Sequence, residues 1–110
     1  MKIEISCDDG NLLDFKIAEK LESLGLNCTF YLPSNCELST KDIQRLAQKF
    51  EIGGHTYSHF QDLKKIVNDE YLEYEIKANK DWLEELTGKK INKFCYPRGR
   101  YNERVIKFVK

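Results

Sequence analysis

Hydrophobic and polar positions near the start of the chain follow first the spacing of a strand and then that of a helix. Residues 2–6 (KIEIS) alternate between polar and apolar side chains, as in a half-buried β-strand. From Leu13 to Leu24 the large apolar residues recur at helical spacing, as on one face of an α-helix. Gly25 follows and is suited to end that helix, because glycine adopts a left-handed backbone without steric cost.

The same order of strand and helix returns in the middle of the chain. Residues 28–32 (CTFYL) are rich in β-branched and aromatic side chains, which favour strands. Ser39 and Asp42 have the spacing of a capping box, and residues 43–50 continue with apolar side chains at helical spacing. Residues 51–53 then predict a brief third strand.

The last part of the sequence predicts a long helix, a fourth strand and a final helix. Residues 69–86 carry apolar side chains at helical spacing, and Gly88 follows as a stop signal. Residues 93–96 read as a short strand, and the Pro-Arg-Gly sequence at 97–99 predicts a turn. Asn102 is suited to cap a last helix that runs through Val109.

Strands that alternate with helices are typical of a mostly parallel sheet with right-handed crossovers. The sequence therefore predicts an α/β fold with four parallel strands in a single domain, residues 1–110. Four strands cannot close into a barrel, so such a sheet would keep two open edges. A homodimer that covers these edges is one expectation, and a monomer whose last helix shields them is the alternative.

Composition indicates neither a membrane span nor an exported, disulfide-bonded protein. Hydrophobic residues make up 41% of the chain, but no apolar run approaches the roughly 18 residues of a membrane span. The N-terminus lacks the apolar stretch of a signal peptide, so the chain as written is expected in the cytoplasm. As a fragment of a longer precursor it would suit the cell wall or the extracellular space. Cys7, Cys28, Cys36 and Cys95 form no C-x-x-C pair, and free thiols are expected.

The net charge is zero, but the charges are unevenly distributed. Residues 88–110 carry eight basic side chains and one acidic one, whereas residues 1–87 carry ten basic and seventeen acidic ones. A basic segment that also contains Tyr96, Tyr101 and Phe108 could suit a nucleic acid. Basic side chains near the end of a final helix are also ordinary solvated charges that suit the helix dipole. On this second explanation, no nucleic-acid partner is expected.

Three polar segments follow predicted strands, where ligands collect in parallel α/β folds. They are residues 8–10 (DDG), residues 53–59 (GGHTYSH) and residues 96–102 (YPRGRYN). His55 and His59 are the chain's only histidines, and the two glycines before them would let the backbone bend sharply. Because the carboxyl ends of parallel strands share one edge of a sheet, the three segments are predicted to meet.

Two neutral imidazoles and one carboxylate make up the three protein ligands of an open zinc-type site. Such a site leaves one position for water or substrate, and the second aspartate stays free to transfer protons. Each segment also has an ordinary structural explanation. Aspartates before glycine are common in turns and helix caps, His-x-x-x-His occurs by chance on helix faces, and Pro-Arg-Gly forms turns. The coincidence of all three segments at strand ends favours the metal site.

These segments resemble the first three motifs of the polysaccharide deacetylase family, also called the NodB-homology or carbohydrate esterase family 4 domain. The similar stretches are residues 6–10 (SCDDG), 55–59 (HTYSH) and 94–102 (FCYPRGRYN). Residues 83–88 (LEELTG), which lead into the third motif, are similar too. The resemblance runs from Ile5 to about Asn102, and so covers nearly the whole chain.

The resemblance implies a truncated version of a distorted (β/α) barrel, and a metal-dependent hydrolase acting on C–N bonds other than peptide bonds. The expected substrate is an N-acetylated glycan or amino sugar, of the peptidoglycan or chitin kind. By the resemblance, Asp9, His55 and His59 would bind one divalent metal ion, with zinc expected and cobalt, nickel or manganese as alternatives. Asp8 would be the general base that takes a proton from the attacking water.

The third motif would supply the remaining contacts. The backbone N–H of Arg98 would bind the oxyanion, and Tyr96, Pro97 and Arg100 would lie on the oxyanion and substrate side of the site. A guanidinium from Arg98 or Arg100 would lie close to Asp8 and keep its carboxylate ionised.

The chain also departs from the family's pattern. Ser6 and Cys7 stand where Thr-Phe usually precedes the aspartates, Cys95 stands where many members have an arginine, and Arg98 replaces an aromatic residue. The later strands of the family fold are missing, and no third histidine is available to protonate the leaving amine. Two alternatives to a deacetylase therefore stay open. They are a non-catalytic metal- or glycan-binding remnant, and a hydrolase of another C–N amide bond.

Overall fold

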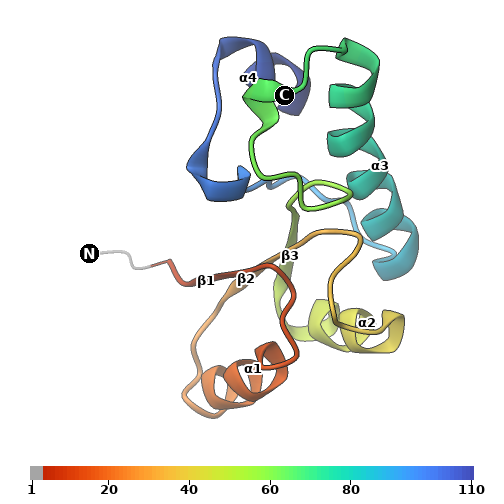
Figure 1. Ribbon diagram of the computed structural model, residues 1–110. Helices are drawn as coiled ribbons and strands as arrows, with labels where there is room; N and C mark the ends of the chain where they lie inside the picture. Colours follow the sequence, from red (N-terminus) through yellow and green to blue (C-terminus); the bar gives the residue numbers. More distant parts are fainter. Residues whose placement is uncertain (1–3) are drawn as a thin grey trace.

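A three-stranded parallel sheet lies at the centre of the molecule (Figure 1). The computed structural model describes residues 4–110. The strands β1 (Ser6–Asp8), β2 (Thr29–Leu32) and β3 (Glu51–Gly54) follow one another across the sheet in this order. A helix connects each strand to the next, so the predicted α/β class with a parallel sheet is confirmed.

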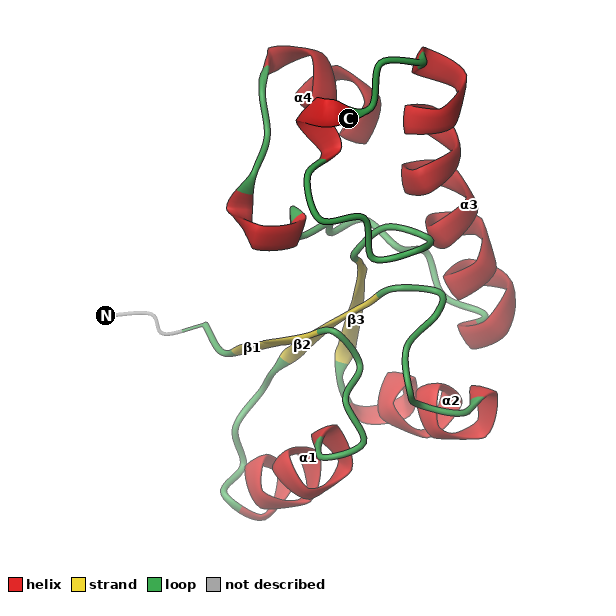
Figure 2. Cartoon of the chain, in the orientation of Figure 1, coloured by secondary structure: helices red, strands yellow, loops and turns green. Residues whose placement is uncertain are grey.

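Within residues 4–110 the helices are α1 (Asp14–Ser23), α2 (Thr40–Lys49), α3 (Asp69–Thr87) and α4 (Glu103–Val109). The first three pack on the sheet, and α4 packs on α3 and on the 3₁₀ turn Leu63–Lys65. Figure 2 shows α1 and α2 below the sheet, α4 above it, and the long α3 running along its side. Two short 3₁₀ turns, Leu63–Lys65 and Pro97–Gly99, precede α3 and α4. Among the described residues, no helix has both the length and the apolar composition that a bilayer crossing requires.

The helix ends form where the sequence places capping residues. The Ser39 hydroxyl accepts a hydrogen bond from the Asp42 N–H at 3.1 Å, and the Asp42 carboxylate accepts one from the Ser39 N–H at 3.3 Å. Asn102 caps α4 by accepting from the Val105 N–H at 2.9 Å. Gly88 ends α3 with a left-handed backbone, φ 71°. Caps of this kind contribute about 1 kcal/mol each to helix stability.

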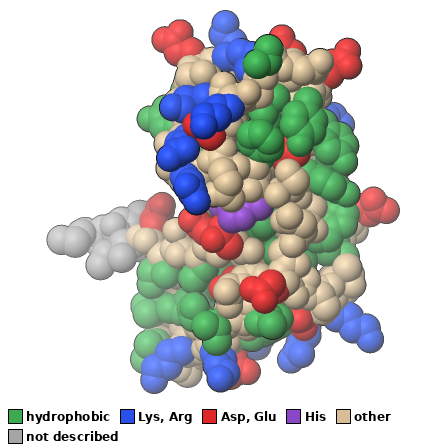
Figure 3. All heavy atoms as spheres, in the orientation of Figure 1, with side chains coloured by type: hydrophobic (Ala, Val, Ile, Leu, Met, Phe, Trp, Pro, Cys, Tyr) green, Lys and Arg blue, Asp and Glu red, His purple; other side chains and the backbone are tan. Residues whose placement is uncertain are grey.

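The apolar core has two parts, and the candidate site lies between them. One part fills the space between the sheet, α1, α2 and the end of α3, and contains Phe30, Ile43 and Leu83. The other lies between the start of α3, α4 and the first 3₁₀ turn, and contains Leu72 and Val105. Figure 3 shows the histidine side chains at the surface where the upper and lower parts of the molecule meet.

The first strand is displaced from its predicted position. It runs from Ser6 to Asp8 rather than over residues 2–6, because Ser6, Cys7 and Asp8 are the residues that pair with β2. The start of the predicted strand, residues 2–3, lies outside the described residues. Asp8 is therefore the last residue of an edge strand, and Asp9 follows in the turn.

The predicted fourth strand is wrong in extent. Residues 93–96 make only a single parallel bridge, between Gly54 and Phe94. The Gly54 N–H donates to the Lys93 carbonyl at 2.8 Å, and the Cys95 N–H donates to the Gly54 carbonyl at 2.9 Å. Pairing stops there because Pro97 has no N–H and begins a 3₁₀ turn.

Candidate metal centre

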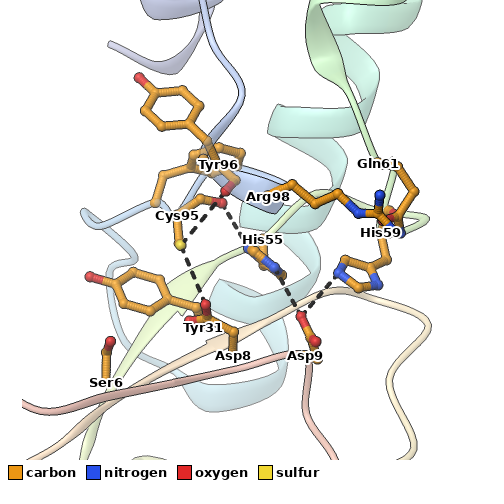
Figure 4. A pocket seen from close by; sticks show the side chains of 12 residues that line it. Ser6, Asp8, Asp9, Tyr31, His55, His59, Gln61, Cys95, Tyr96 and Arg98 are labelled. Atoms are coloured by element: carbon orange, nitrogen blue, oxygen red, sulfur yellow. Dashed lines mark hydrogen bonds and ion pairs between the residues drawn. The ribbon is translucent and has the colours of Figure 1, made fainter.

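The three predicted segments meet around an open cavity of about 930 Å³ at the carboxyl ends of the strands (Figure 4). Most of the predicted site residues line it: Asp8, Asp9, His55, His59, Tyr96 and Arg98. Of the predicted residues that the structure describes, Pro97 and Arg100 do not line the cavity. The fold thus brings together side chains from the two ends and the middle of the chain.

Asp9, His55 and His59 converge on one point. The Asp9 Oδ1 atom lies 3.1 Å from His55 Nε2 and 3.0 Å from His59 Nε2. One ligand atom from each residue lies within 4.8 Å of the others, and the imidazole centroids are 5.0 Å apart. The His55 side chain is 3% exposed and that of His59 29% exposed, so one face of the group opens to the cavity.

The hydrogen bonds of His55 determine which of its nitrogens can bind a cation. Its Nδ1 lies 2.7 Å from the Cys95 carbonyl oxygen, which can only accept, so Nδ1 carries the proton of the neutral imidazole. Nε2 then presents a lone pair to the Asp9 carboxylate at 3.1 Å. Two acceptors this close need a proton or a metal ion between them. The donor set of two imidazoles and a carboxylate therefore fits a divalent ion of the zinc type.

Strained backbone is concentrated at this site. Among the described residues, the non-glycine positions with positive φ are Asp9 (77°), Thr56 (73°), His59 (56°) and Arg98 (56°). A left-handed backbone costs an L-residue roughly 1–2 kcal/mol, and a β-branched residue such as Thr56 is particularly disfavoured there. The Thr56 hydroxyl partly offsets this cost by accepting from the Phe60 N–H at 3.0 Å.

The two glycines before His55 serve a different purpose from the predicted one. Both lie in β3 with ordinary backbone angles, so they do not provide a sharp bend. A Cβ on Gly53 would meet the Tyr31 ring at 2.5 Å, and a Cβ on Gly54 would meet Asn79 Oδ1 at 2.8 Å. Glycine is needed here because neighbouring side chains approach the backbone closely, which depends on tertiary packing.

Asp8 lies beside the three donors and contacts Cys95. Its Oδ2 is 3.8 Å from the Cys95 sulfur. Burial raises the pKa of Cys95 to about 11, and the negative charges of Asp8 and Asp9 add to the effect. The thiol therefore keeps its proton at neutral pH and donates to Asp8. The competing role as a cap of α1 is not seen, because Asn11 accepts from the Leu13 N–H there at 2.9 Å.

The predicted contact between Asp8 and an arginine is wrong. Arg100 instead pairs with the buried carboxylate of Asp62, with Nη1 and Oδ2 3.5 Å apart. Figure 4 shows the Arg98 side chain extending along the cavity away from Asp8. The chain reverses at the Pro97–Gly99 turn, so the residue that faces Asp8 is Cys95, which precedes that turn.

Asp14, the first residue of α1, is a buried carboxyl that sequence reasoning did not identify. It is 3% exposed, and its Oδ2 has no hydrogen-bond partner among the described residues. Burial, together with the charges of Asp9 and Asp8, raises the pKa of Asp14 to about 6. Its charge is thus coupled to those of Asp8 and Asp9, although Asp14 does not line the cavity.

Comparison with known proteins identifies similar sequences. A family model described as polysaccharide deacetylase matches residues 2–110. The chain is 37% identical over 81 residues to a peptidoglycan-N-acetylglucosamine deacetylase of Bacillus cereus. This match covers 70% of the present chain and 29% of that protein.

Solved structures with the same fold are also larger. A peptidoglycan N-acetylglucosamine deacetylase in complex with 4-naphthalen-1-yl-N-oxidanyl-benzamide has a TM-score of 0.89 and 28% identity, over 98% of this chain and 51% of that one. A carbohydrate esterase family 4 pseudoenzyme from Bacillus anthracis has a TM-score of 0.78 and 22% identity, over 96% of this chain and 38% of that one. The chain thus spans about half or less of the relatives it matches.

Proposed function

The chain belongs to the polysaccharide deacetylase family, and from this premise we propose that it hydrolyses N-acetyl groups of an N-acetylated carbohydrate. The proposed substrates are peptidoglycan- or chitin-like glycans, and the proposed metal is zinc, with cobalt, nickel or manganese as alternatives. The observation that carries the proposal is the convergence of Asp9, His55 and His59 on one open point, with Asp8 beside them.

Asp9, His55 and His59 would hold the metal ion. When bound, such an ion supplies a Lewis acid that lowers the pKa of water and polarises an acetyl carbonyl. His55 is pre-oriented for this role because the Cys95 carbonyl holds its Nδ1 proton. Asp9 reaches both histidines from the turn after β1.

Asp8 is the proposed general base. It lines the cavity, and its Oδ2 accepts a hydrogen bond from the Cys95 thiol, which leaves Oδ1 to accept a proton from the attacking water. The same carboxyl then carries the proton that the leaving nitrogen needs. Water and the amide are thereby converted into acetic acid and an amine, which at neutral pH become acetate and the protonated amine.

The remaining lining residues suit a sugar and a developing oxyanion. Tyr31, Phe94 and Tyr96 present aromatic surface to the cavity, and tyrosine adds a hydroxyl at the polar end of an apolar ring. The backbone N–H of Arg98 is the proposed donor to the oxyanion, because the turn at Pro97–Gly99 places this residue on the lining.

A second candidate function is metal or glycan binding without catalysis. It is favoured by the fact that the chain spans 51% of the similar deacetylase structure and 29% of the Bacillus cereus relative. A pseudoenzyme shares the fold, so the fold by itself does not establish catalysis. The Asp9 side chain is 56% exposed, which leaves this part of the site open to solvent.

The test measures acetate released from chito-oligosaccharides and peptidoglycan fragments by the zinc-loaded protein. We expect release by the wild type, and a loss of at least about a hundredfold in Asp8→Asn with zinc still bound. Asp81→Asn, an exposed carboxylate of α3, is the matched control and should keep full activity. A wild type that binds zinc but releases no acetate from either substrate would support the non-catalytic function instead.

A further inference from the structure

Two polar side chains of α3 are buried against the histidine segment and have no part in the chemistry above. Glu75 is 1% exposed and Asn79 is fully buried. They are four residues apart and therefore lie one turn apart on the same helix face. Burying a carboxylate is costly unless strong hydrogen bonds satisfy it. Among the described residues Glu75 forms no ion pair, so its hydrogen bonds must offset this cost.

The hydrogen bonds of Glu75 hold the residues directly before His59. Its Oε1 accepts from the Ser58 N–H at 2.9 Å, and the Ser58 hydroxyl lies 3.0 Å from Oε1 and 2.8 Å from Oε2. Its backbone carbonyl accepts from the Tyr57 N–H at 2.8 Å. The Tyr71 hydroxyl also hydrogen-bonds to Glu75, which raises the pKa of Tyr71. One residue of α3 thus fixes two consecutive residues of the loop.

Asn79 holds the other end of the same segment. Its Oδ1 accepts from the His55 N–H at 2.8 Å, and its Nδ2 donates to the Leu32 carbonyl at 3.0 Å. The amide therefore links the start of the histidine segment to the end of β2. The helix face bearing Glu75 and Asn79 supports both ends of the segment from His55 to His59.

The two histidines differ in how their rings are fixed. His55 has a partner on each nitrogen, the Cys95 carbonyl at Nδ1 and Asp9 at Nε2. His59 contacts Asp9 through Nε2, and among the described residues nothing is bonded to its Nδ1. A metal-binding histidine is normally oriented by a partner on its second nitrogen. His59 lacks such a partner and also has the strained φ of 56°, so its backbone must set its direction.

We propose that Glu75 is a positioning residue for His59: its carboxylate clamps Ser58 and thereby holds the left-handed turn that directs His59 Nε2 toward Asp9. The inference rests on the proposed metal site. Loss of the clamp would free the segment between Ser58 and Phe60 to relax to an ordinary backbone, which moves the imidazole away from the other two donors.

The test compares zinc affinity in Glu75→Gln with that of the wild type, by competition with a chromophoric chelator at pH 7. Glutamine keeps the size of the side chain but removes the negative charge that strengthens the hydrogen bonds from Ser58, and replaces the acceptor Oε2 with an amide group that only donates. We expect zinc affinity to fall about tenfold, the range known for outer partners of metal ligands. Glu73→Gln, an exposed residue on the same helix, is the matched control and should stay within twofold.

Urea unfolding of the metal-free variants separates positioning from stability. A Glu75→Gln protein that is folded, with a lower unfolding midpoint but wild-type zinc affinity, would overturn the inference. If Glu75→Gln does not fold, Ser58→Ala replaces it, because Ser58 is exposed and its hydroxyl is one of the two Ser58 groups that donate to the carboxylate. An affinity about threefold weaker supports the clamp, and wild-type affinity in Ser58→Ala overturns it.

Failure of the proposed function has a separate signature. If the wild type binds no zinc, the proposed metal site is wrong. The positioning role of Glu75 is then tested by NMR on the metal-free proteins. The His55 and His59 rings, 5.0 Å apart, should show a nuclear Overhauser contact in the wild type and in Glu73→Gln. Its loss in Glu75→Gln supports the positioning role, and its persistence there overturns it.

Discussion

The two loops that enclose the cavity are held in place in different ways. The segment 55–59 is bonded by buried side chains of α3, through Asn79 at one end and Glu75 at the other. The segment 96–102 is held by its own turn, in which the Gly99 N–H donates to the Tyr96 carbonyl at 2.8 Å and the Arg100 N–H to the Pro97 carbonyl at 3.2 Å. Its ion pair with another part of the chain joins Arg100 and Asp62 at 3.5 Å. Residues 98–102 of this second loop are exposed.

The contrast separates the two tasks of the candidate site. Metal binding needs donors fixed within a fraction of an ångström, and rigid supports supply that. Contacts with a variable glycan are better made by a loop that can adjust. We therefore expect substitutions around the first loop to change metal affinity and stability, and substitutions in the second loop to change neither appreciably.

The largest expected effect comes from removing a donor on the first loop. His59→Ala should weaken zinc binding by at least about a hundredfold, more than the loss of an outer partner costs. Chelator competition measures the affinity. Glu73→Gln, an exposed residue of α3 outside the cavity lining, is the control and should bind zinc as the wild type does. Equal affinities in His59→Ala and the wild type would place the ion elsewhere.

Breaking the support of the same loop should mainly lower stability. Asn79→Ala leaves the His55 N–H and the Leu32 carbonyl without their partner in a buried place. We expect the free energy of unfolding to fall by about 2–3 kcal/mol, as for other buried polar groups left unsatisfied. Urea denaturation measures it, with the exposed Asn92→Ala as the control. A loss below about 0.5 kcal/mol would contradict the support that we describe.

Asp14 makes the free energy of unfolding depend on pH. Its pKa is raised to about 6 by burial, so the folded state holds the proton more tightly than the unfolded state, whose pKa is near 3.8. The associated stability is therefore present below pH 4 and is lost as pH rises through about 6.

The metal-free Asp14→Asn variant should lack this loss. We expect it to be more stable than the wild type by about 2 kcal/mol at pH 7, and nearly equal to it at pH 4. Thermal unfolding in the presence of EDTA at both pH values tests this. Parallel pH profiles for the two proteins would show that Asp14 ionises as freely in the folded chain as in the unfolded one.

The smallest effect is expected in the second loop. Arg98→Gly removes the guanidinium and also suits the left-handed backbone, φ 56°. We expect zinc affinity within twofold of the wild type and a gain in stability of less than about 1 kcal/mol. Chelator competition and urea denaturation measure the two quantities. A tenfold loss of zinc affinity would mean that this loop also orients a metal donor.

The sequence was sufficient to predict the helices, the second and third strands, and the meeting of the motifs. Capping residues such as Ser39 and Asn102 act locally, so their helices begin where expected. His55, His59 and Asp9 were predicted to meet because loops after parallel strands share one edge of the sheet, and their ligand atoms do converge. These inferences depend on chain order and spacing, which the sequence contains.

The supports of the site could not be predicted in this way. Glu75 and Asn79 lie on the same helix face as Leu72, Ile76 and Leu83, all of them buried. Polar residues at such positions are an available signal, because that face should otherwise be apolar. The partners of Glu75 and Asn79 depend on where α3 packs. Likewise, the contact of Asp8 with Cys95, in place of the predicted arginine, depends on the path of the chain before the Pro97–Gly99 turn. Tertiary placement decides such contacts, and spacing along the sequence does not determine it.

The short edge strand β1 positions both aspartates of the candidate site, so its local opening would take the site apart. Ser6–Asp8 pairs with β2 on one side, and this strand delivers Asp8 and then Asp9 to the cavity. Edge strands of this length open locally at far lower free energy than a protein's core, because few hydrogen bonds must break. Each opening would withdraw both aspartates while the histidines stay bonded to α3 and to Cys95. We therefore expect the fraction of molecules with both aspartates in place to depend on the fraying of these three residues more than on global unfolding.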